Sequence, residues 1–266
     1  METYSITGKR KEELMEIARV LGVTITAIPQ PTPDLSDIVI ATYDEPFQEL
    51  LAKSNETFKG TPAEITISSG EVKQGHETFR SALRTTALTL GFSHLPITPL
   101  QSEELVLQYQ QDPNSVPKPL SQYWEDLALI LYSLQGTNQQ KANYLFQQLQ
   151  ANNLPTELPL LIINPGLEKD TNFPHNAKFT VIPGLTQSVH HETLKQRQDH
   201  KFNYGLEHGL PSINDLGTGN RTLYMPSSNK DLGLKVLYRG GFLALISRNE
   251  GLIVSDVGGR VTLART

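Results

Sequence analysis

From Leu223 to the end of the chain, apolar residues occur in short runs that Gly, Asn, Asp and Ser residues interrupt. These runs are Gly233–Arg239, Phe242–Ser247, Gly251–Ser255 and Arg260–Ala264. Short runs bounded by turn-forming residues predict strands joined by tight connections. Antiparallel sheets accommodate such strands, because one face of the sheet packs on the core and the other faces solvent. The pattern therefore restricts the C-terminal part to a β-rich module with many loops.

The first hundred residues show a different pattern, in which strand and helix signals alternate. The spacing of apolar residues predicts helices over Lys9–Leu21, Asp44–Lys53 and His76–Leu90, and Gly91 is well placed to end the last of these. Short strands are predicted at four places: Tyr4–Thr7, Val23–Ile28, Ile38–Ala41 and Ala63–Ser68. This order indicates a small α/β layer structure.

The middle of the chain is predicted to be helical. Residues 92–120 are expected to form a long connection with one short helix near Glu103–Gln110. Apolar residues then recur at helical spacing and predict a helix over Ser121–Leu134, followed by a second over Gln139–Gln150. Asn152–Pro159 is polar and contains proline, so it predicts a boundary between a domain of residues 1–153 and a domain of residues 154–266.

Beyond that boundary, strands are predicted over Leu160–Asn164 and Lys178–Ile182, with a polar helix over Ser188–Phe202. Together with the C-terminal runs, these elements predict an α+β chain. Its N-terminal half would be a small α/β and helical part of unknown role, and its C-terminal half would be β-rich.

Composition excludes several classes of function. The chain has 266 residues, a formal net charge of −5 and no cysteine. The negative charge argues against a broad nucleic-acid surface, and the lack of cysteine excludes disulfides and thiolate chemistry. The longest apolar run, Leu127–Tyr132, is far shorter than the ~20 residues that span a bilayer. With no signal peptide at Met1–Leu14, a cytoplasmic or particle-associated location without membrane insertion is expected.

Val189–Gly209 contains the densest group of metal-ligating residue types: His190, His191, Glu192, Asp199, His200, Glu207 and His208. Imidazole and carboxylate ligands suit zinc, manganese or iron, and a metal-bound water would permit hydrolysis. A helical zinc pair, however, needs two histidines at i and i+4. His190 and His191 are adjacent, so on a helix they would point about 100° apart. A metal-dependent hydrolase or nuclease is therefore kept as the alternative function, beside a solvated helix without metal.

Basic residues of the C-terminal part, among them Arg221, Lys235 and Arg239, are spread among acidic ones rather than gathered in a block. This distribution predicts an ordinary surface of mixed charge. Between Arg239 and Ala264, evenly spaced leucines such as Leu245 and Leu263 predict an inward face, with chemically mixed residues between them.

These C-terminal residues resemble the variable proteins of diversity-generating retroelements, which carry a C-type-lectin-like fold. The resemblance consists of the start Arg239–Gly241, the spaced leucines and the closing strand Gly259–Val261. In that family, adenine-directed mutagenesis diversifies surface positions at codons that cannot yield Lys, Glu, Gln, Met or Trp. Within residues 240–258, Glu250 is the one residue of these five types.

The resemblance implies a ligand-binding protein with a hypervariable recognition surface and no catalysis. The implied ligand-binding residues are Gly241, Phe242, Ala244, Ile246, Ser247, Arg248, Asn249, Ile253, Val254, Asp256, Val257 and Gly258. No metal or cofactor is required for this function. The partner would be a protein or another surface ligand whose identity the sequence leaves open, as it leaves open the oligomeric state.

Overall fold

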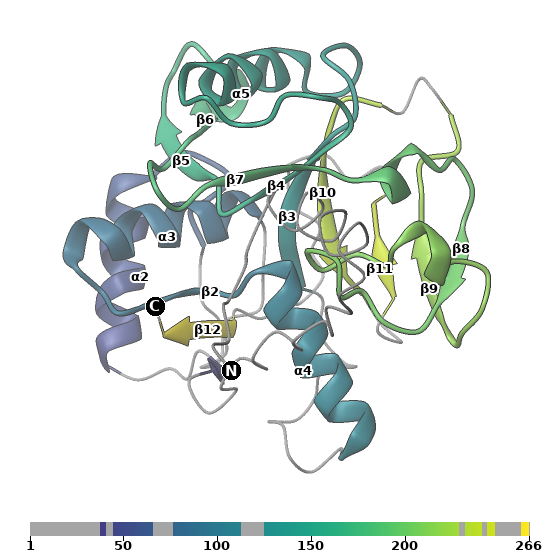
Figure 1. The fold of residues 1–266 in the computed structure, drawn as a ribbon. Coiled ribbons are helices and arrows are strands. Elements are labelled where there is room, and N and C mark those ends of the chain that lie inside the picture. Colours follow the sequence, from purple (N-terminus) through teal and green to yellow (C-terminus); the bar gives the residue numbers. More distant parts are fainter. Residues whose placement is uncertain are drawn as a thin grey trace, which may run out of the picture. The chain divides into compact units, whose positions relative to one another are not determined.

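A computed structural model describes residues 38–40, 45–65, 77–112, 125–228, 232–240, 244–247 and 262–265 (Figure 1). All of them belong to the compact unit Leu35–Thr266. Helices and a seven-stranded mixed sheet give this unit the predicted α+β class. Four predicted elements lie outside the described residues: Tyr4–Thr7, Lys9–Leu21, Val23–Ile28 and Gly251–Ser255.

The large sheet has the strand order β7-β4-β3-β10-β11-β9-β8. Its strands are β3 (Glu125–Leu131), β4 (Leu160–Ile163), β7 (Gln187–His190), β8 (His200–Phe202), β9 (Arg221–Tyr224), β10 (Leu234–Arg239) and β11 (Leu245–Ile246). β11 and β9 run parallel, whereas the other neighbours are antiparallel. The predicted strands near residues 160, 234 and 245 are therefore confirmed.

The prediction of a helix over Ser121–Leu134 is wrong, because Glu125–Leu131 is the central strand β3. Successive residues of β3 face two different hydrophobic clusters: Leu129 and Leu131 belong to one, and Ala128 and Ile130 to the other. A strand that is buried on both faces needs a continuous apolar run rather than an alternating one. Such a run also matches helical spacing, so periodicity alone does not distinguish the two structures.

Four helices lie in the described part of the chain: α2 (Glu45–Thr57), α3 (Glu77–Leu90), α4 (Pro99–Gln111) and α5 (Gln139–Ala151). All four confirm predicted helices, although α4 begins earlier than expected. Thr98 and Gln101 form a capping box at the start of α4, and Pro99 occupies a position where a missing N–H costs nothing. Gly91 follows α3 with a φ of 68°, which favours glycine.

A second sheet joins the carboxyl end to the first part of the unit. β12 (Thr262–Arg265) pairs antiparallel with β1 (Ile38–Ile40) on one side and β2 (His94–Pro96) on the other. Leu263 of β12 belongs to a hydrophobic cluster that includes Phe47 of α2 and side chains of α3. The predicted strands Ile38–Ala41 and Arg260–Ala264 are thus confirmed where they are described.

The polar helix predicted over Ser188–Phe202 is also wrong. β7 continues to His190, a 3-10 turn η3 follows at Glu192–Lys195, and β8 begins at His200. Ser188 lies opposite Ile162 of β4, so the first part of this segment is an edge strand of the large sheet. In β7, Gln187 is exposed, whereas Ser188 is buried and its hydroxyl donates to the Pro155 carbonyl at 2.6 Å.

The remaining elements are short. β5 (Gly166–Lys169) and β6 (Ala177–Thr180) form a two-stranded sheet, and η2 (Pro174–Asn176) and η4 (Ile213–Asp215) are short 3-10 turns. The predicted boundary between residues 153 and 154 falls between α5 and β4. β3 precedes that position and β4 follows it, yet the two strands pair in the large sheet. Among the described residues, no helix is long and apolar enough to cross a membrane.

Candidate functional site

The structure describes three of the twelve predicted ligand-binding residues. Ala244 and Ser247 are buried, and Ile246 is half-buried. The Ser247 hydroxyl forms a hydrogen bond with the Tyr132 hydroxyl at the end of β3. These three side chains therefore pack on or into the large sheet. The other nine lie outside the described residues: Gly241, Phe242, Arg248, Asn249, Ile253, Val254, Asp256, Val257 and Gly258.

Backbone contacts hold residues 244–247 in the sheet. The Gly240 N–H donates to the Ala244 carbonyl at 2.9 Å, and the Ser247 N–H donates to the Tyr224 carbonyl at 3.0 Å. A Cβ atom on Gly240 would lie 2.8 Å from Cδ1 of Ile246, so a larger residue there would have to displace the end of that side chain. The predicted inward orientation of Leu245 and Leu263 is confirmed, because both are buried.

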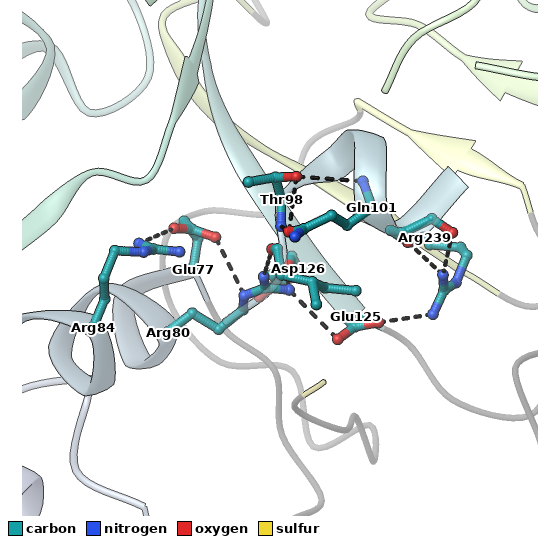
Figure 2. A network of polar contacts seen from close by, with 10 residues as sticks. Glu77, Arg80, Arg84, Thr98, Gln101, Glu125, Asp126 and Arg239 are labelled. Atoms are coloured by element: carbon teal, nitrogen blue, oxygen red, sulfur yellow. Dashed lines mark hydrogen bonds and ion pairs between the residues drawn. The ribbon is translucent and has the colours of Figure 1, made fainter. Parts of the chain in front are cut away.

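A chain of buried charged side chains begins at Arg239, the last residue of β10, and we call it the buried charge network: Glu77, Arg80, Arg84, Glu125 and Arg239 (Figure 2). Arg239 Nη2 donates to Glu125 Oε2 at 2.7 Å, and Arg80 Nη1 lies 3.6 Å from Glu125 Oε1. Glu77 lies between the two arginines of α3, 3.7 Å from Arg80 Nε and 3.2 Å from Arg84 Nη1. All five side chains are fully buried.

Backbone and hydroxyl groups complete the network. Arg80 donates to the carbonyls of Asp126 and Ile97, and Arg239 donates to the Ser102 hydroxyl of α4. Arg84 Nη1 donates to the Pro165 carbonyl at 2.7 Å. Because guanidinium groups carry several donors in a fixed plane, each arginine can bind two elements at once. The network thus joins α3, α4, β3 and β10 to the segment between β4 and β5.

Burial also shifts the protonation equilibria in this region. Desolvation raises the pKa of Asp126 well above its usual range, and the negative charge of Glu77 adds to that rise. The same carboxyl accepts a hydrogen bond from the backbone N–H of Glu77 at the start of α3. Desolvation lowers the pKa of Arg84 to about 10, although the nearby Glu77 opposes this effect. Asp126 is therefore biased toward its uncharged form.

A second buried pair links α4 to β9. Glu103 accepts two hydrogen bonds from Arg221, at 2.5 Å and 2.6 Å, and a third from the Gly205 N–H at 2.9 Å. The Arg221 guanidinium also lies 4.5 Å from the centre of the Phe202 ring. Such a two-point contact between arginine and a carboxylate fixes both position and orientation.

The predicted mixed-charge surface is wrong for Arg221, Lys235 and Arg239, because all three are buried. Sequence reasoning also missed the acidic partners of Arg221 and Arg239, which lie far from them along the chain. One signal was present: Glu77, Arg80 and Arg84 are spaced so that they lie on one face of a helix. Opposite charges on the same helical face as core residues indicate a buried polar network.

The side chains of the histidine-rich segment form separate polar contacts. His190 Nε2 lies 3.0 Å from Glu192 Oε1, while His191 Nε2 donates to the Glu207 carbonyl at 3.1 Å. The Thr193 N–H donates to His191 Nδ1, so this histidine caps η3. No group of three or more possible metal ligands occurs among the residues that the structure describes.

Comparisons with known proteins found no match: no family model, no curated protein and no solved structure is similar to this chain.

Proposed function

We propose that this chain is a ligand-binding protein that presents its recognition residues between β10 and β12, on a C-terminal C-type-lectin-like scaffold. The observation that carries the proposal is the burial of the strands at both ends of that stretch. All six residues of β10 are buried, and so are Leu263 and Ala264 of β12. Each strand pairs with elements far away in the sequence. On this proposal the scaffold takes its packing energy from β10, β12 and the buried residues of β11, and the remaining side chains between them are free to vary.

Two kinds of side chain would make the contacts. Phe242, Ile253 and Val254 would supply apolar area, whereas Asn249 and Asp256, with Arg248, would supply directional hydrogen bonds. Ala244 and Ser247 are assigned to the scaffold because they are buried. Recognition residues are best varied where a packed layer supports them from below, so this division suits a diversified surface.

A stability experiment tests the division between scaffold and recognition residues. We expect Phe242→Ser, Asn249→Ala and Asp256→Ala each to change the free energy of unfolding by about 0.5 kcal/mol or less, as is usual for solvent-facing positions. The matched controls Leu245→Ala and Leu263→Ala remove buried side chains and should each cost about 2–5 kcal/mol. Urea denaturation measures both sets. Losses of equal size in the two sets would overturn the proposal.

A binding experiment tests the function itself. Peptides are selected from a random cyclic-peptide library displayed on phage, with the wild-type chain immobilised. Their affinity is then measured for the triple variant Phe242→Ser/Asn249→Ala/Asp256→Ala and for the control Glu168→Gln, which changes an exposed residue of β5. We expect the triple variant to lose binding and the control to keep it. Equal binding by both variants would refute the proposed surface.

The proposed resemblance also has a genomic test. The DNA that encodes Arg239–Arg260 should have a near-copy close by, differing mainly at adenines, next to a gene for a reverse transcriptase. The absence of such a copy from the surrounding genome would remove the diversification part of the proposal.

A further inference from the structure

Two side chains on neighbouring turns of α4 each carry a buried oxygen without a donor. Glu104 Oε2 and Gln108 Oε1 are shielded from solvent, and neither has a hydrogen-bond partner among the residues that the structure describes. Both residues are half-buried as a whole, so the rest of each side chain still reaches the surface. Buried polar groups in native proteins are almost always hydrogen-bonded, so two such oxygens on one helix need an explanation.

The spacing of the two residues places them on the same face of α4. Side chains at positions i and i+4 of a helix are neighbours, with about 5–6 Å between their Cβ atoms. An ionised carboxylate accepts hydrogen bonds and donates none, and the same holds for an amide oxygen. One proton on Glu104 changes this, because the carboxylic acid then donates to Gln108 Oε1 and both side chains gain a partner.

The basic groups that meet α4 bind other carboxylates. Arg221 of β9 binds Glu103 at 2.5 Å. Arg239 of β10 binds Glu125 of β3 at 2.7 Å. Burial raises the pKa of Glu104 to about 7, and no charged group among the described residues contributes to this rise. A proton from solvent is therefore the simplest ligand that satisfies the two oxygens.

We propose that Glu104 and Gln108 form a proton-binding contact on α4, in which the carboxylic acid of Glu104 donates to Gln108 Oε1. The exposed part of the Glu104 side chain gives the proton a path from solvent. When the proton leaves, a charged carboxylate faces an acceptor, and the side chain turns outward to be hydrated. The contact is thus closed with the proton and open without it. The proposal is independent of the recognition surface near the carboxyl end.

Titration of the carboxyl group tests proton binding directly. The 13C signal of the Glu104 carboxyl is followed by NMR between pH 4 and pH 9 and is assigned by its absence in Glu104→Gln. We expect a midpoint near 7, well above the ordinary value of 4.5. A midpoint at or below 4.5 would refute the proposal, because the Gln108 amide would then present its N–H groups to a charged carboxylate. A midpoint that falls when calcium chloride is added would also refute it, because the oxygens would then hold a metal ion.

Stability measurements test what the proton does. Because the folded-state pKa is raised, the stability due to this contact is full below pH 4.5 and is lost as the pH rises through 7. The ratio of folded to unfolded chains changes by at most about tenfold per pH unit in that window. Glu104→Gln carries a permanent donor, so its urea midpoint should exceed that of wild type at pH 8, and the difference should shrink toward pH 5. Other groups titrate in this range, so the comparison with the variant isolates this carboxyl.

Two further variants separate the hydrogen bond from the mere removal of a charge. Glu49→Gln makes the same change at an exposed position of α2 and should give no gain at pH 8. Gln108→Met removes the acceptor, so the gain from Glu104→Gln should be smaller in its presence. A gain of equal size with and without Gln108→Met would show that the two side chains do not meet, and the proposed contact would be wrong.

Discussion

Two ion pairs in this chain have the same length and opposite surroundings. Arg239 Nη2 lies 2.7 Å from Glu125 Oε2, and Lys195 Nζ lies 2.7 Å from Glu192 Oε1. Both side chains of the first pair are 0% exposed, whereas Lys195 is 45% exposed and Glu192 60%. Charges interact more strongly where water is excluded, but they also lose more hydration there. Length alone therefore does not tell what an ion pair contributes.

The comparison shows what the buried pair does that the exposed pair does not. If one partner of the exposed pair is lost, water solvates the other. If Glu125 is lost, Arg80 and Arg239 stay buried and both lose a carboxylate that they contact, which is strongly unfavourable. The buried charge network thus penalises any arrangement in which α3, β3 and β10 do not meet correctly. We infer that it specifies the fold more than it stabilises it.

The largest effect is expected for Glu125→Gln, which keeps the shape of the side chain and removes its charge. Two buried guanidiniums then share a neutral amide, so the free energy of unfolding should fall by about 3–5 kcal/mol. Urea denaturation followed by circular dichroism measures the loss. Glu168→Gln is the control, because it makes the same chemical change in an exposed pair with Lys178. Equal losses for the two variants would break the comparison.

The next largest loss of stability is expected at a buried hydrogen bond between two neutral side chains. This contact tests the effect of burial in the absence of charge. Tyr132→Phe removes the partner of the Ser247 hydroxyl in the core, which should cost about 1–3 kcal/mol. Adding Ser247→Ala removes the unpaired hydroxyl as well, so the double variant should regain part of the loss. The measurement is a double-mutant cycle of unfolding free energies. A double variant whose loss equals the sum of the single losses would show that the two hydroxyls do not interact.

The sequence predicted the amphipathic elements well, because their periodicity comes from one buried face. α2 and α5 each have such a face and lie at the expected places; in α5, for example, Ala142, Leu145 and Leu149 are buried. α3 is also found where it was predicted, although all of its residues from Glu77 to Arg84 are buried. The two wrong helices lack that contrast. β3 is apolar on both faces, and Ser188–Phe202 buries polar residues such as Ser188 and His191 along with apolar ones such as Leu194. In both segments the neighbouring strands decide the structure, and a single sequence does not name those neighbours.

The buried charge network could not be predicted from the sequence, for a related reason. Arg239 and Glu125 are far apart along the chain, and each residue alone resembles an ordinary surface charge. Only the pairing of β10 with β3 brings them together and excludes water. The spacing of Glu77, Arg80 and Arg84 on one helical face could be read from the sequence. It indicates a buried network, however, only if that part of the helix is known to be buried.

A smaller effect is expected from His191, which is buried and uncharged. The Thr193 N–H donates to Nδ1, so the ring proton lies on Nε2 and a second proton would meet that N–H. Burial lowers the pKa of His191 below 6.5, while Glu207 opposes the shift and His208 and His190 support it. The unfolded chain then binds a proton that the folded chain does not. Stability due to this histidine is full above the unfolded pKa and is lost as the pH falls through 6.5.

The measurement is the free energy of unfolding between pH 8 and pH 5 for wild type and His191→Gln. One proton gives a slope of at most ~1.4 kcal/mol per pH unit, and this slope should appear in wild type and be reduced in the variant. His94→Gln changes a half-buried histidine of β2 and is the control. Identical pH profiles for wild type and His191→Gln would show that this histidine does not titrate differently on folding.

The smallest loss of stability is expected for Glu192→Gln. Its size tests whether solvent exposure explains the difference between the two ion pairs. Hydrogen bonds from Lys195 and then His190 lower the pKa of Glu192, so the carboxylate is charged in the folded chain and interacts with both. Water replaces these partners when the charge is removed, and salt screens what remains. The unfolding midpoint should therefore match that of wild type within error at high salt, with at most a slight decrease at low salt. A decrease comparable to that of Glu125→Gln, persisting at high salt, would mean that the 2.7 Å contact and not its surroundings sets the energy, and the contrast between the two pairs would no longer hold.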